Sequence, residues 1–448
     1  MKKIKIGKYT LESLTTGMYV DPYVLYREYI QNAADSIDKA IIIKIIDKKD
    51  GKIIVNVLKD KREIEIIDNG CGISKDKVFS VLMDIGNSEK KSDYDKGFRG
   101  IGRLSGLGYC DKIIFETSAA GENIKSSVVF DSIKLQELLS PGKYENLELE
   151  DVISQSSNIE IDEEKKEEHY FKVKLINVNK KLKLLDFEKV LQYLQETAPV
   201  PYDTESFEFG KNINEKLNDL NIKIDEYNIF LCNEDVVTKV YKPYRSKLVV
   251  DLKKRILDEV EDIYLDVIRN DLKDDKLVAL VWYGKIKLYG TIIEETLKGL
   301  RFRKSGLLIG DRFLANQLFK EERFNGWVIG EIIILDKDII PNARRDDFEK
   351  NDDYLFLMKK LAAIGEKISN EIRLTSKRRT DIQKNSKDKE ANRNNATSTN
   401  SISIIKKIDE LISGIEFKEG VFVKLEKILR KYDVSDEKIN NILEDFKL

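Results

Sequence analysis

One stretch, Arg27-Glu28-Tyr29-Ile30-Gln31-Asn32-Ala33-Ala34-Asp35, carries three polar side chains at helical spacing. At about 100° per residue, offsets of four and seven return to within roughly 40° of the start, so Glu28, Asn32 and Asp35 share one helix face. Asp21-Pro22 before it suits a helix start. A carboxylate beside an amide can polarise a water molecule and hold a hydrated Mg²⁺. Alone, such a triplet is usually a solvated helix face.

Two glycine-rich breaks follow this helix. Asp68-Asn69-Gly70-Cys71-Gly72 comes directly after a strand-like run. Its glycines let the backbone pass close to a flat ligand, and a buried aspartate there can accept a hydrogen bond from the amino group of adenine. A simple hairpin turn is the alternative, because Asn-Gly is a turn signal.

The second break, Gly97-Phe98-Arg99-Gly100-Ile101-Gly102, opens the next predicted helix. Backbone amides at such a helix start suit phosphate groups. No Gly-Lys-Ser/Thr follows, which excludes a Walker A loop. A polar loop precedes it instead of a strand, which excludes a dinucleotide fingerprint.

In this order and spacing, the three elements resemble the motifs of the GHKL ATPase superfamily, which includes the gyrase B subunit, the ninety-kilodalton heat-shock chaperones, histidine kinases and MutL. The run Arg27 to Asp35 is similar to the first motif and Asp68 to Gly72 to the second. Gly97 to Gly100 is similar to the MutL form of the third. The resemblance covers roughly residues 12 to 180 and implies an α+β fold, with a Bergerat-type ATP-binding α/β sandwich and with ATP and Mg²⁺ as cofactors.

The resemblance also implies a role for individual residues. Glu28 is then the general base, Asn32 the Mg²⁺ ligand and Asp68 the partner of the adenine amino group. Asn87 to Lys96 is then a mobile lid, whose Lys90 and Lys91 approach phosphate. The implied nucleotide-binding residues are Asn32, Asp35, Asp68, Gly70, Gly72, Asn87, Lys90, Gly97, Gly100, Ile101 and Gly102, with Gly72 at adenine and Gly100 and Gly102 at phosphate.

One strand departs from the superfamily pattern. The superfamily usually carries a Gly-Thr pair on a late strand, with the threonine near adenine. The matching strand, Tyr170 to Val178, places Phe171 at the threonine position. The adenine-side contact, or the alignment of this strand, is therefore left open.

A second resemblance lies further along the chain. Ile340-Pro341-Asn342-Ala343-Arg344-Arg345-Asp346 is similar to the heat-shock-chaperone segment that delivers a catalytic arginine to the γ-phosphate. It implies Arg345 as that arginine, with Arg344 as the runner-up and Asn342 as a neighbour. Arginine suits the task because its charge is permanent and its donors form a planar fork. An exposed basic turn paired with Asp346 and Asp347 is the alternative.

The chain has 448 residues, 41% hydrophobic and 35% charged, which favours several folded domains over disorder. The domains expected are an ATP-binding domain at 1–200, an α/β middle, transducer-like domain at 201–350, a charged helical segment at 351–390, a flexible linker at 391–403 and a small helical tail at 404–448. Strands are predicted at Lys52 to Leu58, Leu277 to Tyr283, Lys285 to Thr291 and Trp327 to Leu335.

Composition excludes several function classes. The formal net charge is only −2, so a nucleic-acid role needs a local patch. The only histidine, His169, excludes multi-histidine metal centres and reads as a strand-edge residue. It also argues against an autophosphorylating histidine kinase, because no acceptor histidine precedes the ATP motifs. Three scattered cysteines argue against disulfides and zinc, and no apolar run suits a signal peptide or membrane span, so a cytoplasmic protein is expected.

The arrangement most resembles the heat-shock chaperones, which implies an ATPase that closes its lid, clamps as a homodimer and acts on an unidentified protein client. The alternative is an ATP-switched clamp on DNA, as in MutL or MORC proteins, in anti-phage defence. The stretch Arg373 to Arg393 favours it, with eight basic and three acidic residues, although a solvated helix fits as well. A nucleotide-binding scaffold without turnover is the third reading.

Overall fold

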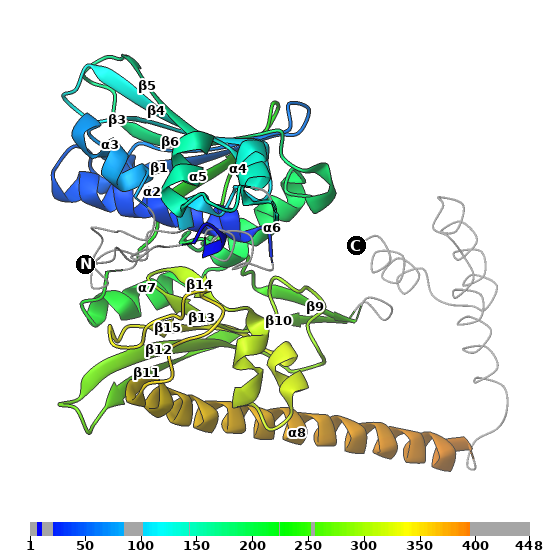
Figure 1. Cartoon of the computed structure of the whole chain (residues 1–448). Coiled ribbons are helices and arrows are strands. Elements are labelled where there is room, and N and C mark those ends of the chain that lie inside the picture. Colours follow the sequence, from blue (N-terminus) through cyan, green and yellow to red (C-terminus); the bar gives the residue numbers. More distant parts are fainter. Residues whose placement is uncertain are drawn as a thin grey trace, which may run out of the picture. The chain divides into compact units, whose positions relative to one another are not determined.

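The computed structural model describes residues 7–10, 21–84, 102–142, 144–223, 225–251 and 256–394. The chain divides into two compact units, Met1–Ser376 and Lys377–Leu448. The first unit contains an eight-stranded and a five-stranded sheet together with most of the helices (Figure 1). The expected α+β class is therefore confirmed.

The eight-stranded sheet is antiparallel throughout, except that β1 and β7 run parallel. Across the sheet its strands are β5 (Ser157–Glu163), β4 (Ile124–Asp131), β3 (Lys112–Ser118), β6 (Tyr170–Ile176), β2 (Glu63–Asp68), β1 (Lys52–Leu58), β7 (Asn228–Cys232) and β8 (Val237–Lys239). Because β7 and β8 follow residue 200, the sheet extends past the boundary expected there.

Apolar and polar side chains alternate along the strands, which explains why helices cover one face of this sheet. Ile53, Val55 and Val57 of β1 all point into one buried core. Lys172 and Lys174 of β6 instead form ion pairs with glutamates of neighbouring strands on the other face. The helices packed into this core are α2 (Val24–Ile42), α3 (Lys75–Leu82), α4 (Ser132–Leu139), α5 (Leu149–Ser156) and α6 (Phe187–Thr197), as Figure 1 shows.

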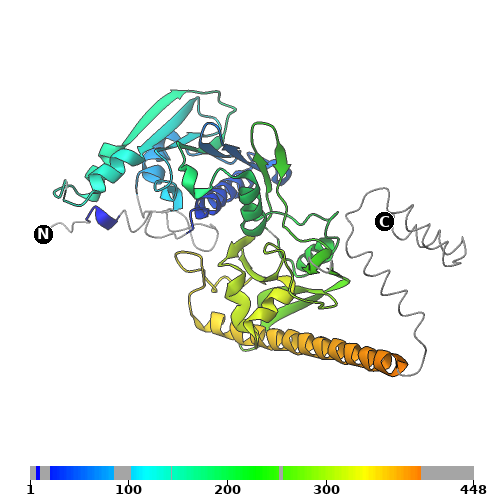
Figure 2. The ribbon, with the colours of Figure 1, turned by 90° about the vertical axis from the view of Figure 1, so that its right-hand side faces the viewer.

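The five-stranded sheet is buried on both faces. Its strands, in spatial order, are β11 (Asp262–Asn270), β12 (Lys276–Lys285), β15 (Ile329–Ile334), β13 (Gly299–Lys304) and β14 (Leu307–Ile309). Val281 and Tyr283 of β12 pack in the core formed with α8 (Asp352–Asn394), whereas Trp282 packs in the opposite core with α7 (Gly210–Asp219). Figure 2 shows the first part of α8, up to Ser376, running along this sheet.

The remaining described elements are short. They are the ribbon of β9 (Lys247–Asp251) and β10 (Ile256–Glu259), and the 3₁₀ segments η1 (Lys48–Asp50), η2 (Gly102–Leu104), η3 (Lys180–Leu182), η4 (Arg312–Leu318) and η5 (Glu322–Trp327). Among the described residues, no helix combines the length and the apolar character needed to cross a membrane.

Two predicted elements differ from the structure. The strand expected at Lys285 to Thr291 is absent, because Asp258 accepts hydrogen bonds from the backbone amides of Lys287 and Tyr289, at 3.0 Å each. These amides are then not available to a strand partner. A single 3₁₀ turn, η2, replaces the helix expected from Gly102.

The structure describes only part of the segments predicted at the carboxy-terminal end of the chain. α8 continues to Asn394, so the first residues of the linker expected at 391–403 are helical. The remaining linker and the tail expected at 404–448 lie outside the described residues.

A buried group of charges joins the five-stranded sheet to the end of α6. Glu331 on β15 accepts hydrogen bonds from Tyr202 and from Lys242, at 3.0 Å for the lysine, and it pairs with Arg303. Arg303 in turn donates to the backbone carbonyl of Glu196 at 2.8 Å. Burial alone would raise the pKa of Glu331, but the Arg303 guanidinium and the Lys242 ammonium outweigh it and lower this pKa to about 2.

Replacing Glu331 with glutamine should lower the free energy of unfolding by about 3–5 kcal/mol, because Arg303 and Lys242 are left as buried, uncompensated charges. The depressed pKa of Glu331 stabilises the folded state above its ordinary value of 4.5, and this stabilisation is lost as the pH falls toward about 2. Urea unfolding of Glu331→Gln should therefore depend less on pH in that interval.

The control is Glu366→Gln, which removes an exposed pair with Lys320. It should change the free energy of unfolding by less than about 1 kcal/mol. Equal effects of the two substitutions would contradict the importance of the buried group.

Candidate active site

The carboxylate of Glu28 lies at the centre of the site and is only 8% exposed. Its Oε1 accepts a hydrogen bond from Nη2 of Arg27 at 3.2 Å, within a buried ion pair. Its Oε2 faces Gly102, where an added Cβ would lie 2.3 Å from that oxygen. The helix of the first motif and the glycine of the third motif are therefore in direct contact.

The other two members of the helix face are also in place on α2. Asn32 is half-buried one turn after Glu28, and Asp35 is buried. Tyr29, on the neighbouring face, donates to the carbonyl of Arg103 at 3.1 Å and accepts from the amide of Gly106 at 3.1 Å. This tyrosine holds the segment that follows Gly102 against α2.

The turn after β2 is also fixed against α2. Asp68 is 2% exposed and accepts a hydrogen bond from the amide of Gly70 at 2.9 Å. A Cβ on Gly70 would come within 2.2 Å of Oγ of Ser36. Nδ1 of His169 lies 2.8 Å from the carbonyl of Gly70, so this nitrogen carries the proton that it donates. His169 is therefore more than the strand-edge residue that the sequence suggests.

Gly72 ends this turn in a conformation that only glycine adopts without strain. Its φ is +64°, and a Cβ would lie 1.9 Å from the carbonyl oxygen of Ser118. Burial raises the pKa of the Cys71 thiol beside it, which disfavours the thiolate form. The backbone of the turn at Gly72 therefore packs directly against the end of β3.

The pairing register places Phe171 between two polar residues of the neighbouring strands. Phe171 is paired with Asp68 on one side and with Thr117 of β3 on the other. The hydroxyl group in this row thus comes from Thr117, which accepts from the amide of Ile73 at 2.8 Å and donates to the carbonyl of Tyr170 at 3.0 Å. The sequence analysis missed Thr117, although it is a polar residue on the apolar side of an alternating strand.

The arginine segment of the middle domain reaches this site through its backbone. The guanidinium Nη2 of Arg27 donates to the carbonyl oxygen of Arg344 at 3.1 Å, across 317 positions of sequence. Arg345, the next residue, is half-buried with φ +57°, and its carbonyl accepts from the amide of Gly310 at 2.8 Å. The side chain of Arg344 is exposed and pairs with Asp346 at 3.1 Å. One arginine, Arg27, therefore contacts both Glu28 and the arginine segment.

Several predicted residues cannot be placed. Asn87, Lys90, Lys91, Gly97, Gly100 and Ile101 lie outside the described residues. The two ends of that segment are close together, because Arg103 donates to the carbonyls of Leu82 and Asp84.

Residues 24–166 match the protein family described as "Histidine kinase-, DNA gyrase B-, and HSP90-like ATPase". This part of the chain is a GHKL ATPase domain. Curated proteins similar to it include the chaperone protein HtpG of Escherichia coli strain K12 and of Escherichia coli O157:H7. Each is 31% identical over 143 residues, which cover 28% of this chain and 23% of the relative. The chain thus matches less than a quarter of the length of these chaperones.

The described residues of the GHKL domain fit a nucleotide and a magnesium ion. The amide oxygen of Asn32 beside the carboxylate of Glu28 is the kind of oxygen ligand that Mg²⁺ prefers. Gly70 and Gly72 let the backbone beside Asp68 pack directly against Ser36 and Ser118, where a side chain would clash. Oε1 of Gln31 is buried on the same helix without a hydrogen-bond partner among the described residues.

Gly72→Ala should destabilise the GHKL domain by more than about 2 kcal/mol, and it should weaken ATP binding. The left-handed backbone alone costs an alanine about 1–2 kcal/mol, and the contact with the Ser118 carbonyl adds to this cost. The measurements are urea unfolding and the binding of a fluorescent ATP analogue.

Gly121→Ala is the matched control. Gly121 has φ +88°, but its added Cβ would meet nothing within 4 Å. It should show the backbone cost alone and leave ATP binding unchanged. If the two substitutions behave alike, the close approach at Gly72 does not matter.

Proposed function

We propose that this chain is a Mg²⁺-dependent ATPase of the chaperone-like type, in which ATP closes the lid at Asn87 to Lys96 and brings two copies together. The contact of Arg27 with both Glu28 and the backbone of Arg344 carries this proposal, because it links the candidate base to the segment that bears the candidate catalytic arginine. The similarity of residues 24–166 to a GHKL family that includes chaperones supports the same class.

Glu28 accepts the proton of the attacking water in this proposal. Its ion pair with Arg27 fixes the direction of the carboxylate, and the contact of Oε2 with Gly102 leaves no side chain between this oxygen and the third motif. Asn32 holds Mg²⁺, which neutralises phosphate charge when bound. Asp68 and the backbone at Gly72 receive adenine, and the hydroxyl of Thr117 holds the end of that turn.

Arg345 neutralises the charge that grows on the γ-phosphate. Its backbone is held from both sides, since its amide donates to the carbonyl of Asn342 at 3.1 Å and its carbonyl accepts from Gly310. A guanidinium on such a fixed turn can act as a preorganised donor. Arg344 is the runner-up, and its exposed side chain pairs with Asp346 at 3.1 Å.

A DNA-associated clamp is the alternative. The described part of the basic stretch on α8 offers exposed Lys377 and Arg378. Arg373, however, is already bound to Glu321 at 3.0 Å. Because Arg373 is already in an ion pair, it contributes less to a DNA-binding surface. The chaperone-like function is therefore better supported than the DNA clamp.

Glu28→Ala should lower kcat for ATP hydrolysis by about 10²–10⁴-fold while ATP binding is retained, because a general base is lost. Phosphate release with Mg²⁺ measures the effect. Glu28→Gln keeps the shape of the side chain beside Arg27 and should show the same loss. Glu116→Ala, which removes a pair with Lys172 on the outer face of the sheet, is the control.

Equal rates for Glu28→Ala and the wild type would show that Glu28 is not the base. ATP binding with no turnover by the wild type would indicate a scaffold. Hydrolysis that rises with duplex DNA and falls steeply with salt would favour the clamp on DNA.

Arg345→Ala should lower kcat by roughly 10³-fold with little change in ATP affinity, because its charge acts on the developing phosphate charge. Arg344→Ala is a matched control on the adjacent residue, since its backbone contact with Arg27 is preserved. It should stay within about twofold of the wild type, because only an exposed ion pair is lost. The reverse order of effects would reassign the catalytic arginine to Arg344.

A further inference from the structure

The segment that carries Arg345 is a small hairpin, called here the arginine hairpin (residues 339–349). Its two arms are joined by a bridge between Pro341 and Phe348 and by a hydrogen bond from the amide of Asn342 to the carbonyl of Asp347 at 2.9 Å. The amide of Glu349 adds a bond to the carbonyl of Ile340 at 2.9 Å. These bonds couple the two arms, so the position of the base contributes to the position of the tip, together with the contacts that Gly310 and Arg27 make there.

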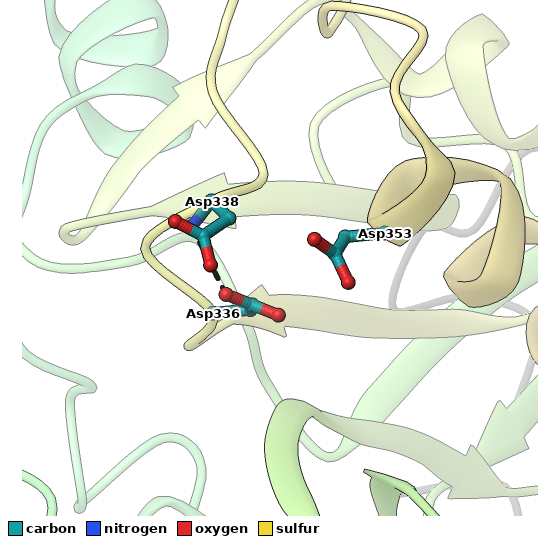
Figure 3. A group of neighbouring side chains, drawn as sticks. All are labelled: Asp336, Asp338 and Asp353. Atoms are coloured by element: carbon teal, nitrogen blue, oxygen red, sulfur yellow. Dashed lines mark hydrogen bonds between the residues drawn. The ribbon is translucent and has the colours of Figure 1, made fainter. Parts of the chain in front are cut away.

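Carboxylates lie at both ends of this hairpin. Asp336 and Asp338 come just before it, after β15, and Asp353 comes just after it, in the first turn of α8. Figure 3 shows the three carboxyl groups gathered in one place, and their oxygens lie within 4.8 Å of one another. Asp336 and Asp353 are buried. The base of the hairpin is thus held where three negative charges meet.

Lysines from the sheet supply the compensating charge. Nζ of Lys276, at the start of β12, lies 2.6 Å from Oδ1 of Asp336 and 2.6 Å from Oδ2 of Asp338. Lys273, in the turn before β12, pairs with Asp353 at 2.7 Å. Lys304, at the end of β13, donates to the carbonyl oxygen of Asp336. Two of these lysines pair with the three carboxylates and the third bonds to a backbone carbonyl, so the negative charge at the base is compensated by ammonium groups.

The bridging lysine is the central member of this group. Burial opposes the charge on Lys276, but its hydrogen bonds to Asp336 and Asp338 raise its pKa to about 12. Lys276 therefore remains charged throughout the neutral range. Asp336 has a second oxygen, Oδ2, which is buried without a hydrogen-bond partner among the described residues. Removing the ammonium would therefore leave this carboxylate buried with no cation on either oxygen, and the base of the hairpin would shift.

We propose that Lys276 is a positioning residue for Arg345, which it keeps in place by tying the base of the arginine hairpin to β12. This inference rests on the proposed catalytic role of Arg345. Lys276 itself does not touch the nucleotide. Its effect should therefore appear in the rate of the chemical step and not in the binding of ATP.

The test is a double-mutant cycle on the full chain. Lys276→Met should lower kcat about tenfold, because a small displacement of a catalytic group is costly, and it should leave KM for ATP and the affinity for an ATP analogue unchanged. In the Arg345→Ala background, Lys276→Met should change kcat by less than about twofold. Lys276→Arg should restore most of the rate, because a guanidinium can also bridge two carboxylates.

The control is Lys287→Met, which removes an exposed pair with Glu261 near the other end of β12. It should leave kcat unchanged. Additive losses for Lys276→Met and Arg345→Ala, or a loss in KM alone, would overturn the inference. So would calcium binding, measured by calorimetry on the nucleotide-free protein, that Asp353→Asn abolishes. If Arg345→Ala itself has no effect, the proposed function fails at this residue, which is a separate result.

Discussion

The buried ion pair of Arg27 and Glu28 is the contact on which the proposed reaction centre depends. It holds a carboxylate with only 8% exposure, and the same guanidinium reaches the carbonyl of Arg344. A buried carboxylate needs a partner, and a buried guanidinium needs acceptors for its several donors. Arg27 meets both requirements, because its guanidinium bonds to Glu28 and to the carbonyl of Arg344. A movement of the segment that carries Arg344 would therefore change the position of Arg27 and, through it, the position of Glu28.

Much of the site could be predicted from residues close together in sequence. The spacing of Glu28, Asn32 and Asp35 needs only the period of a helix, and α2 bears it out. Gly72 marks a turn whose left-handed backbone requires glycine. The contact of Arg27 with Arg344 could not be predicted in this way, because the two residues are far apart in sequence and meet only through the tertiary fold. Thr117 carried a local signal, as a polar residue on the apolar side of β3, but only the strand register places it beside Phe171.

The same holds for the fold: elements set by neighbouring residues could be predicted, and those set by residues distant in sequence could not. Strands with regular alternation, such as β1, were predicted at their observed bounds. The strand predicted at Lys285 to Thr291 does not form, because the carboxylate of Asp258 accepts hydrogen bonds from the amides of Lys287 and Tyr289. Asp258 is distant from these residues in sequence. The eight-stranded sheet takes β7 from beyond residue 200 to cover the edge of β1. A fragment that ended at residue 200 would therefore expose this edge strand and its unpaired backbone groups.

The single histidine of the chain has a use that follows from its position. Nδ1 of His169 bonds to the carbonyl of Gly70, inside the turn that follows Asp68. Because the sequence contains no other histidine, the imidazole signals in a proton or nitrogen NMR spectrum of the whole 448-residue chain come from one known place. Selective labelling of histidine alone thus turns this residue into a built-in spectroscopic reporter, and nucleotide titrations can be followed at that turn without assigning the rest of the spectrum.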